Sequence, residues 1–185
     1  TLSLTDGTAT VTKDLTIEII NLNDAAPKFT SEATFTADEN QKAIGQVTAI
    51  DVEGDDITFS ISGNEISIAN DGTLTFIDAP DHEAQTVETA TVTASDGVNA
   101  SEQAITININ NLNDNNPVFT SSSILSGDEN QTGIATVSAT DADGDNVSFT
   151  TSSSDLAITS EGVLTFITEP DYESVQSLTA TITAS

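Results

Sequence analysis

The chain has 185 residues with three lysines, no arginine and 30 acidic residues, so its formal net charge is −27. This charge excludes nucleic acid as a partner and disfavours an anionic membrane surface, because phosphate binding needs a basic protein surface. Cysteine is absent and the apolar runs are short, which excludes a disulfide framework, a thiolate metal site and direct membrane insertion in this fragment.

Short segments of alternating apolar and polar residues predict β-strands throughout the chain, beginning with a hairpin in residues 1–20. The next full stretch of 90 residues is expected to hold about seven strands. Their expected ranges are 33–37, 43–50, 57–62, 66–69, 73–77, 86–95 and 101–110. Seven short strands with turns at this spacing predict an all-β fold of antiparallel, Greek-key β-sandwich modules of the Ig-like class.

The sequence repeats with a period of 90 residues and without a gap. Over the 66 pairs from Thr30/Thr120 to Ser95/Ser185, 29 residues are identical. The Asp-Glu-Asn at 38–40, for example, returns at 128–130. A fixed period indicates one module used in series, so we expect the function to lie in the array and its junctions.

The repeat predicts three parts of unequal completeness. Residues 1–22 are expected to be the C-terminal hairpin of a truncated repeat, 23–112 a complete repeat, and 113–185 a repeat that lacks its last strand. Because methionine is also absent, we expect the chain to be an excerpt of a longer protein. The connectors Asn21–Pro27 and Asn111–Pro117 are short and end in proline, which predicts stiff links.

Acidic residues recur at four fixed places in each period. In the first full period they are Asp38-Glu39, Asp51/Glu53/Asp55, Asp81/Glu83 and the Asn-Asp of the connector. Oxygen-only clusters without histidine or cysteine suit a hard cation, and calcium takes about six to eight such ligands. The alternative is that each cluster consists of solvated turn residues, but their recurrence in phase with the connectors favours calcium. An EF-hand does not fit, because the glycine after Asp143 stands at loop position 4 and Ser152 at position 12.

The order of these motifs resembles that of cadherin repeats over nearly the whole chain. The segments that carry the resemblance are Glu39-Asn40, Ala49-Ile-Asp51-Val-Glu53, Asp81-His-Glu83, Ala94-Ser-Asp96-Gly97, Asn111-Leu-Asn113-Asp114-Asn115-Asn116-Pro117-Val-Phe119, Glu129-Asn130, Ala139-Thr-Asp141-Ala-Asp143 and Asp171-Tyr-Glu173. With its 90-residue period and lysine-poor composition, the chain is similar above all to the cadherin-like repeats of giant, type I secreted (RTX-type) bacterial adhesins. The resemblance implies an extracellular or cell-surface location, calcium at the junctions between repeats, and a membrane-associated parent protein of the kind found in biofilms.

The resemblance also implies which residues bind calcium. Around the second connector the implied ligands are Glu39, Asp81, Glu83, Asn111, Asn113, Asp114, Asp141, Asp143 and the backbone oxygens of Leu112 and Asn115. Around the first connector they are Asn23, Asp51, Glu53 and Asp96. Asn111 stands where the family usually has aspartate, so one ion is expected to bind more weakly.

The leading hypothesis is a calcium-rigidified extender of a bacterial surface or secreted adhesin, whose partners are the neighbouring repeats of the same chain. One alternative is a binding module for other copies of itself or for surface glycans, although one tyrosine and no tryptophan offer little stacking surface. Another is a filament subunit in which Val11–Ile20 of one chain completes the open edge of the next. We do not expect an enzyme, because the single histidine, His82, is replaced by Tyr172 one period later.

Overall fold

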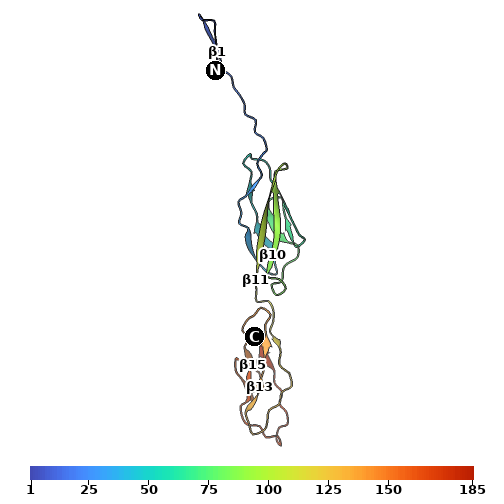
Figure 1. Ribbon diagram of the computed structural model, residues 1–185. Coiled ribbons are helices and arrows are strands. Elements are labelled where there is room, and N and C mark those ends of the chain that lie inside the picture. Colours follow the sequence, from blue (N-terminus) through green and yellow to red (C-terminus); the bar gives the residue numbers. More distant parts are fainter. The chain divides into compact units, whose positions relative to one another are not determined.

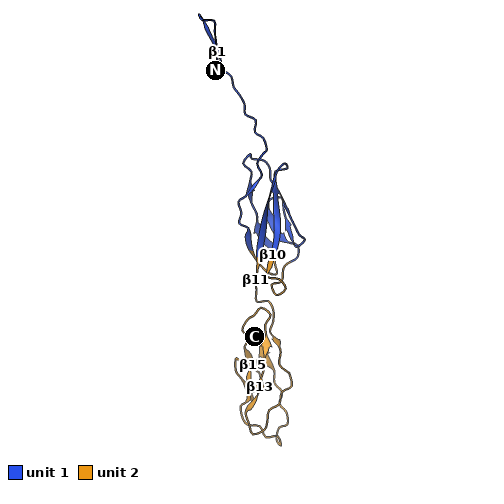
Figure 2. Ribbon diagram, in the orientation of Figure 1, with its two compact units in different colours: residues 1–35, 42–78, 88–107 blue, residues 36–41, 79–87, 108–185 orange.

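The computed structural model describes all residues from Thr1 to Ser185, and its regular elements are β-strands only (Figure 1). The all-β class predicted from the sequence is therefore confirmed. None of the chain is a helix with the length and apolar character needed to cross a membrane. The chain divides into two compact units, one of residues 1–35, 42–78 and 88–107, the other of residues 36–41, 79–87 and 108–185 (Figure 2).

Residues 28–110 form a β-sandwich. Its strands are β3 (Lys28–Phe29), β4 (Thr34–Asp38), β5 (Ala43–Gln46), β6 (Ala49–Ile50), β7 (Thr58–Ile61), β8 (Ile66–Ile68), β9 (Thr73–Phe76), β10 (Val87–Ser95) and β11 (Ala100–Asn110). Their order is β4-β11-β10-β7 in one sheet and β5-β9-β8 in another, and β3 pairs with β6. Because apolar and polar residues alternate, the apolar side chains of each strand point to one face of its sheet, and this face forms the core. Leu74, Val92 and Ile107 are fully buried there.

Strand β11 has a neighbour on each side, β4 and β10. It runs parallel to β4 and antiparallel to β10. For β11 and β4, the backbone hydrogen bonds that show the direction run from Thr106 N to Ala33 O and from Glu39 N to Asn110 O. For β11 and β10, they run from Asp96 N to Asn99 O and from Ile109 N to Thr86 O. Because β11 ends beside the end of β4, the second connector begins next to the acidic residue that follows β4.

The predicted strand at 43–50 is two strands in the structure. β5 pairs with β9, whereas β6 pairs with β3. Between them Val47 N–H donates to Gly72 O at 2.9 Å, and Thr48 O accepts a bond from Thr30 N–H at 2.8 Å. The backbone changes partners at this point, and the short strand β3 that receives it is absent from the predicted strands.

Residues 118–184 repeat much of this arrangement. The strands are β12 (Val118–Phe119), β13 (Gly133–Thr136), β14 (Ala139–Thr140), β15 (Phe149–Thr151), β16 (Leu156–Ile158), β17 (Val163–Phe166) and β18 (Ile182–Ala184). β13, β17 and β16 form one sheet, and β12 pairs with β14 and β15 with β18. The buried core consists of Val137, Phe149, Leu156 and Leu164. Ile124–Asp128, one period after β4, forms no strand.

The first residues form a hairpin of β1 (Leu2–Thr5) and β2 (Thr10–Lys13). It pairs Leu2 with Lys13 and Thr5 with Thr10, which is the register of β10 and β11 shifted by one period. The hairpin is shorter than the sequence indicates, since residues 14–22 belong to no strand. Every residue of β1 and β2 is exposed.

Candidate metal centre

Glu39, the residue after β4, is the one buried charged residue of the chain, at 2% exposure. Its Oε1 accepts a hydrogen bond from Leu112 N–H at 2.7 Å, and its Oε2 accepts one from His82 N–H at 2.8 Å. Asn40 follows in a left-handed conformation with φ of 62°, and its N–H donates to Pro80 O at 3.0 Å. One carboxylate therefore holds together the end of β4, the segment after Pro80 and the second connector.

Three groups of carboxylates share members around this point. In each group one oxygen per residue lies within 4.8 Å of the others, and the groups are Glu39/Asp81/Glu83, Glu83/Asp114/Asp143 and Asp141/Asp143/Asp145. Because Glu83 and Asp143 each belong to two groups, the carboxylates form one continuous set, called the connector cluster below. The structure thus brings together every acidic residue implied for the second connector. The structure adds Asp145 to this set. The sequence could have indicated Asp145, because it is the third acidic residue of the run that starts at Asp141.

The side-chain amide of Asn115 lies among these carboxylates. Its Nδ2 donates to Asp143 Oδ1 at 2.9 Å, to Asp114 Oδ1 at 2.8 Å and to Glu83 Oε2 at 3.2 Å. The backbone N–H groups of Asp114 and Asn115 donate to Asp143 Oδ2 at 3.1 and 2.8 Å. Asn115, implied as a ligand through its backbone oxygen, therefore also orders three carboxylates through its side chain.

The other connector residues implied as ligands take part here as hydrogen-bond donors. Asn111 Nδ2 donates to the backbone oxygen of Asp143 at 2.8 Å, and Asn113 Nδ2 donates to Asp145. Leu112 contributes its N–H to Glu39. The bonds of Asn111 and Asn113 fix the connector against the loop that follows β14, and the bond of Leu112 fixes it against the residue after β4.

No lysine compensates the charge of the connector cluster. The ion pairs of the chain are Lys42 with Asp78 at 4.0 Å and His82 with Glu83 at 3.5 Å, and the second pair is charged only when the histidine is protonated. Two like charges about 4 Å apart repel by roughly 4 kcal/mol at an effective dielectric near 20. The cluster therefore lacks a positive charge of the protein's own.

The titration of two members reflects this crowding. Burial raises the pKa of Glu83, and the neighbouring charges of Glu39 and Asp143 raise it further. The side-chain amide of Asn115, with backbone N–H groups of the connector, holds the pKa of Asp143 below its usual range. The surroundings therefore lower the pKa of Asp143 and raise that of Glu83.

A second acidic group lies at the first connector, within the other compact unit. Oxygens of Asp51, Glu53 and Asp55 lie within 4.8 Å of one another. Asp51 Oδ1 accepts a bond from Glu53 N–H at 2.9 Å, whereas Asp51 Oδ2 is buried without a hydrogen-bond partner. Burial, together with the charges of Asp51 and Asp24, raises the pKa of Glu53. A buried carboxylate oxygen without a partner is costly, and a cation beside it would remove that cost.

The remaining implied residues of the first connector, Asn23 and Asp96, converge on Asn99, which no sequence motif marks. Asn99 Nδ2 lies 2.8 Å from Asn23 Oδ1, 3.4 Å from Asn23 O, 3.2 Å from Ala25 O and 3.4 Å from Asp96 Oδ2. Burial alone would raise the pKa of Asp96, but hydrogen bonds from Asn99 and Val98 lower it overall. The oxygens of Asn23, Ala25 and Asp96 thus surround the side-chain NH2 group of Asn99, which is positively polarised, and such an arrangement of oxygens also suits a cation.

A third group, Glu129, Asp171 and Glu173, corresponds to Glu39, Asp81 and Glu83 one period later. Tyr172 N–H donates to Glu129 Oε2 at 3.1 Å, which matches the bond from His82 to Glu39. All three residues of this group are exposed. The burial of Glu39 is thus a property of the position that the second connector covers.

The donor sets at both connectors fit a hard cation. They consist of carboxylate, amide and backbone oxygens, they carry net negative charge, and one of their oxygens is buried without a partner. Calcium prefers such ligands, whereas zinc and copper prefer nitrogen and sulfur.

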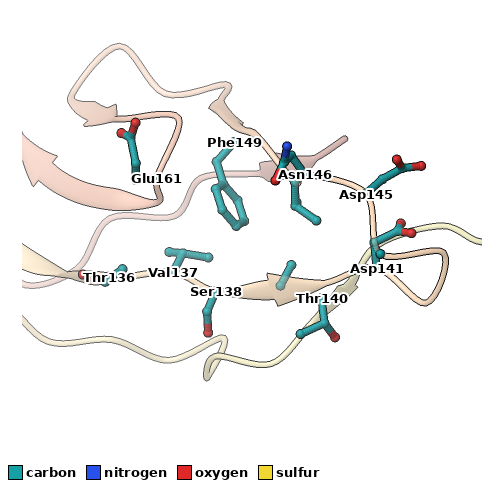
Figure 3. A pocket seen from close by; sticks show the side chains of 12 residues that line it. Thr136, Val137, Ser138, Thr140, Asp141, Asp145, Asn146, Phe149 and Glu161 are labelled. Carbon is teal, nitrogen blue, oxygen red and sulfur yellow. The ribbon is translucent and has the colours of Figure 1, made fainter.

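A cavity of about 440 Å³ lies beside the connector cluster in residues 136–161. Figure 3 shows Phe149 in the middle of its lining, Asp141 and Asp145 on one side, and Glu161 on the other. With one aromatic ring and acidic side chains on two sides, the cavity offers little surface on which a sugar ring could stack.

Comparison with known proteins agrees with the fold. Residues 23–110 match the family described as Bacterial Ig domain. No curated protein sequence matches the chain. Among solved structures, mouse cadherin-23 EC22-24 is similar with a TM-score of 0.70 and 23% identity, over 82% of this chain and 57% of that one.

Two further structures are similar to the same degree. For human protocadherin-24 EC1-2 the TM-score is 0.71 and the identity 19%, over 87% of this chain and 93% of that one. For Drosophila N-cadherin EC1-4 the values are 0.70 and 21%, over 86% and 45%. This chain thus spans about half the length of two of the three structures. At these identities the likeness shows the fold, so the predicted Ig-like, cadherin-like β-sandwich is confirmed.

Proposed function

We propose that this chain is a calcium-rigidified extender of a bacterial adhesin. The observation that carries the proposal is the connector cluster, in which the buried Glu39 and the ionised Asp143 both bind backbone N–H groups of the connector. In the proposed division into repeats at 23–112 and 113–185, this cluster takes its acids from two successive repeats. A cation held there would join the repeats and set the angle between them.

The proposed ligands at the second connector are the carboxylates of the connector cluster with oxygens of Asn111, Leu112, Asn113 and Asn115. At the first connector they are Asn23, Asp51, Glu53 and Asp96. Bound calcium would supply positive charge that neutralises the facing carboxylates and satisfies their free oxygens. Extracellular modules bind calcium at about 10⁻⁴ to 10⁻³ M, so this device would work in a calcium-rich medium outside the cell.

The proposed setting is the surface of a bacterium or the secreted form of its adhesin. Support comes from the match of residues 23–110 to the Bacterial Ig domain family and from similar structures whose names are those of cadherins. The net charge of −27 also suits a saline or calcium-rich medium, because a folded chain this acidic needs counterions. In this setting the partners are neighbouring repeats, and the chain has a structural role instead of a catalytic one.

Calorimetric titration of the chain with calcium chloride tests the proposal. We expect binding with dissociation constants of about 10⁻⁴ to 10⁻³ M or tighter. Asp143→Asn should weaken the tightest binding at least tenfold, because it removes a charge shared by two carboxylate groups. The matched control is Asp155→Asn, an exposed acid outside every cluster, which should bind as the parent chain does. No heat of binding at millimolar calcium, or equal losses in both variants, would overturn the proposal.

A further inference from the structure

Two side-chain amides lie inside the oxygen sets of the connectors, Asn115 at the second connector and Asn99 at the first. The nitrogen of a side-chain amide carries two hydrogens and no net charge. Each of these nitrogens nevertheless lies within hydrogen-bond distance of more oxygens than it has hydrogens. Crowding of oxygens around one point is the arrangement that a cation would satisfy better than an amide does.

The nitrogen of Asn115 contacts all three residues of one carboxylate group. Its Nδ2 lies 2.8 Å from Asp114 Oδ1, 2.9 Å from Asp143 Oδ1 and 3.2 Å from Glu83 Oε2. These are the three residues whose oxygens lie within 4.8 Å of one another. The NH2 group thus lies between three carboxylates with two hydrogens to share among them.

The nitrogen of Asn99 lies in a similar position at the first connector. Asn23 Oδ1 is 2.8 Å from Nδ2, Ala25 O 3.2 Å, and Asn23 O and Asp96 Oδ2 are each 3.4 Å from it. Asn23 and Asp96 are both proposed calcium ligands. Ala25 N–H also donates to Oε2 of Glu53, another proposed ligand, at 3.2 Å. Asn99 therefore binds the segment on which the proposed ligands of this connector converge.

The two connectors obtain their amide from different places in the repeat. One period before Asn115 stands Ala25, whose side chain has no amide. The first connector instead has Asn99, which lies in the turn between β10 and β11. The same arrangement reached from two different positions indicates that an amide among these oxygens serves the site.

We propose that Asn115 and Asn99 are stand-ins for the cation, whose NH2 groups hold the oxygens together without calcium and have to be displaced when calcium binds. This inference rests on the proposed function, because it concerns the regulation of the same calcium sites. Calcium can displace the amide, since it carries two charges and takes about six to eight oxygens, whereas the NH2 group offers two hydrogens. The hydrogen bonds lost in the exchange make the calcium affinity lower than the oxygens alone would give.

The change Asn115→Ala, which copies Ala25 of the first connector, tests the stand-in role. It removes the amide and keeps the backbone oxygen that is a proposed ligand. Because the lost bonds belong to the calcium-free state, the variant should bind calcium about tenfold more tightly, the equivalent of one hydrogen bond to a charged group. A calcium titration of the whole chain, followed by the backbone NMR signals of residues 111–117 and 141–145, measures this affinity. The matched control is Asn116→Ala, at an exposed position, which should bind as the parent chain does.

The same variant should show the opposite effect in chelator. Asp143, which Asn115 Nδ2 contacts, accepts the N–H groups of residues 114 and 115 through its Oδ2. Without the amide these two N–H groups should exchange with solvent about threefold faster or more. A residue that supports the fold alone would loosen the connector without tightening calcium binding, and a side-chain ligand would weaken binding when removed. Faster exchange together with tighter binding therefore distinguishes a stand-in from both.

At the first connector, Asn99→Ala should tighten calcium binding by about threefold, because three of the four oxygens around Nδ2 are neutral and give weaker hydrogen bonds. The NMR signals of residues 23–27 and 96–99 report this site, and Val98→Ala, at a residue 73% exposed, is the control. Affinity that is unchanged or lower in either amide variant would overturn the inference for that connector and leave the proposed function standing. A parent chain that binds no calcium would overturn the proposed function and this inference with it.

Discussion

Glu39 shows how one side chain can organise a site made from segments far apart in the sequence. Each of its two oxygens accepts a hydrogen bond from a backbone N–H group, one from Leu112 and one from His82, so the buried carboxylate is hydrogen-bonded on both sides. The left-handed Asn40 that follows sends its side chain to Asp114, which adds a second tie to the connector. The sequence marks Glu39 as an acid before a strand, but its burial depends on the connector that covers it.

The change Glu39→Gln tests this role in chelator. The amide offers one acceptor where the carboxylate has two, so a buried backbone N–H loses its partner. We expect the free energy of unfolding in urea to fall by about 1–3 kcal/mol. The exposed counterpart Glu129, changed to glutamine, should leave stability within about 0.5 kcal/mol of the parent. Equal effects in the two variants would show that burial by the connector does not matter.

A second residue-scale prediction concerns Gly72, whose backbone oxygen accepts a hydrogen bond from Val47 N–H at the point where the backbone changes partners after β5. Its φ is +87°, and a Cβ there would lie 2.2 Å from the backbone oxygen of Val47. Gly63 has a similar φ of +89° but open space around it. We expect Gly63→Ala to cost about 1–2 kcal/mol from the left-handed conformation alone, and Gly72→Ala to cost clearly more. Thermal unfolding of the two variants checks this, and equal melting temperatures would contradict it.

Glu83 gives a prediction about pH. Because burial and like charges raise its folded-state pKa, its ionised form opposes folding, so its contribution favours folding at low pH and is lost as pH rises through that raised pKa. In chelator, Glu83→Gln should therefore be more stable than the parent chain at pH 7. The difference should shrink as the pH falls through the range where Glu83 takes up its proton. In saturating calcium the order should reverse, because the variant lacks a ligand charge; an unchanged order would argue against a bound cation at Glu83.

At the scale of elements, the strands could be predicted from the alternation of apolar and polar residues, and the connectors from proline and asparagine, because both patterns are local in the sequence. The break within 43–50 could not be predicted from the sequence. Val47, Thr48 and Ala49 keep the alternation of apolar and polar residues, although the backbone pairs with β9 before them and with β3 after them. A period-two pattern records which side is buried and not which strand is the partner.

The candidate metal centre, too, could be predicted only in part from the sequence. Recurrence of acids in phase with the connectors predicts the connector cluster, because a repeat places equivalent residues at equivalent points. Asn99 and the side-chain role of Asn115 could not be predicted, since amides that order carboxylates leave no spacing of their own in a sequence. Their contribution depends on segments that meet only in the folded chain, such as Asn99 with Asn23.

The connector itself yields the element-scale prediction. Asn115→Asp places a further negative charge among Asp143, Asp114 and Glu83, where the amide now donates. In chelator at pH 7 we expect the free energy of unfolding to fall by more than about 1 kcal/mol, because like charges repel strongly at these distances. The neighbouring change Asn116→Asp, at an exposed position, is the matched control. Urea unfolding followed by circular dichroism checks the pair, and equal stability of the two variants would contradict the account of Asn115.

At the scale of the whole molecule, the period of 90 residues repeats the carboxylates as well as the strands. Glu39, Asp81 and Glu83 return as Glu129, Asp171 and Glu173, so both periods carry the same acids at the same positions. An array of this kind would be controlled at its junctions by one variable, the calcium concentration. The domains themselves keep their own cores, so calcium should change the freedom of the connectors more than the fold.

Small-angle X-ray scattering of the chain in calcium and in chelator measures that freedom most directly. We predict that calcium gives the profile of a rigid particle, and that chelator gives a flexible one with a broader distribution of dimensions. Asp143→Asn should shift the calcium profile towards the chelator profile, whereas Asp155→Asn should not. Identical profiles of the parent chain with calcium and with chelator would contradict the claim that calcium rigidifies the connector.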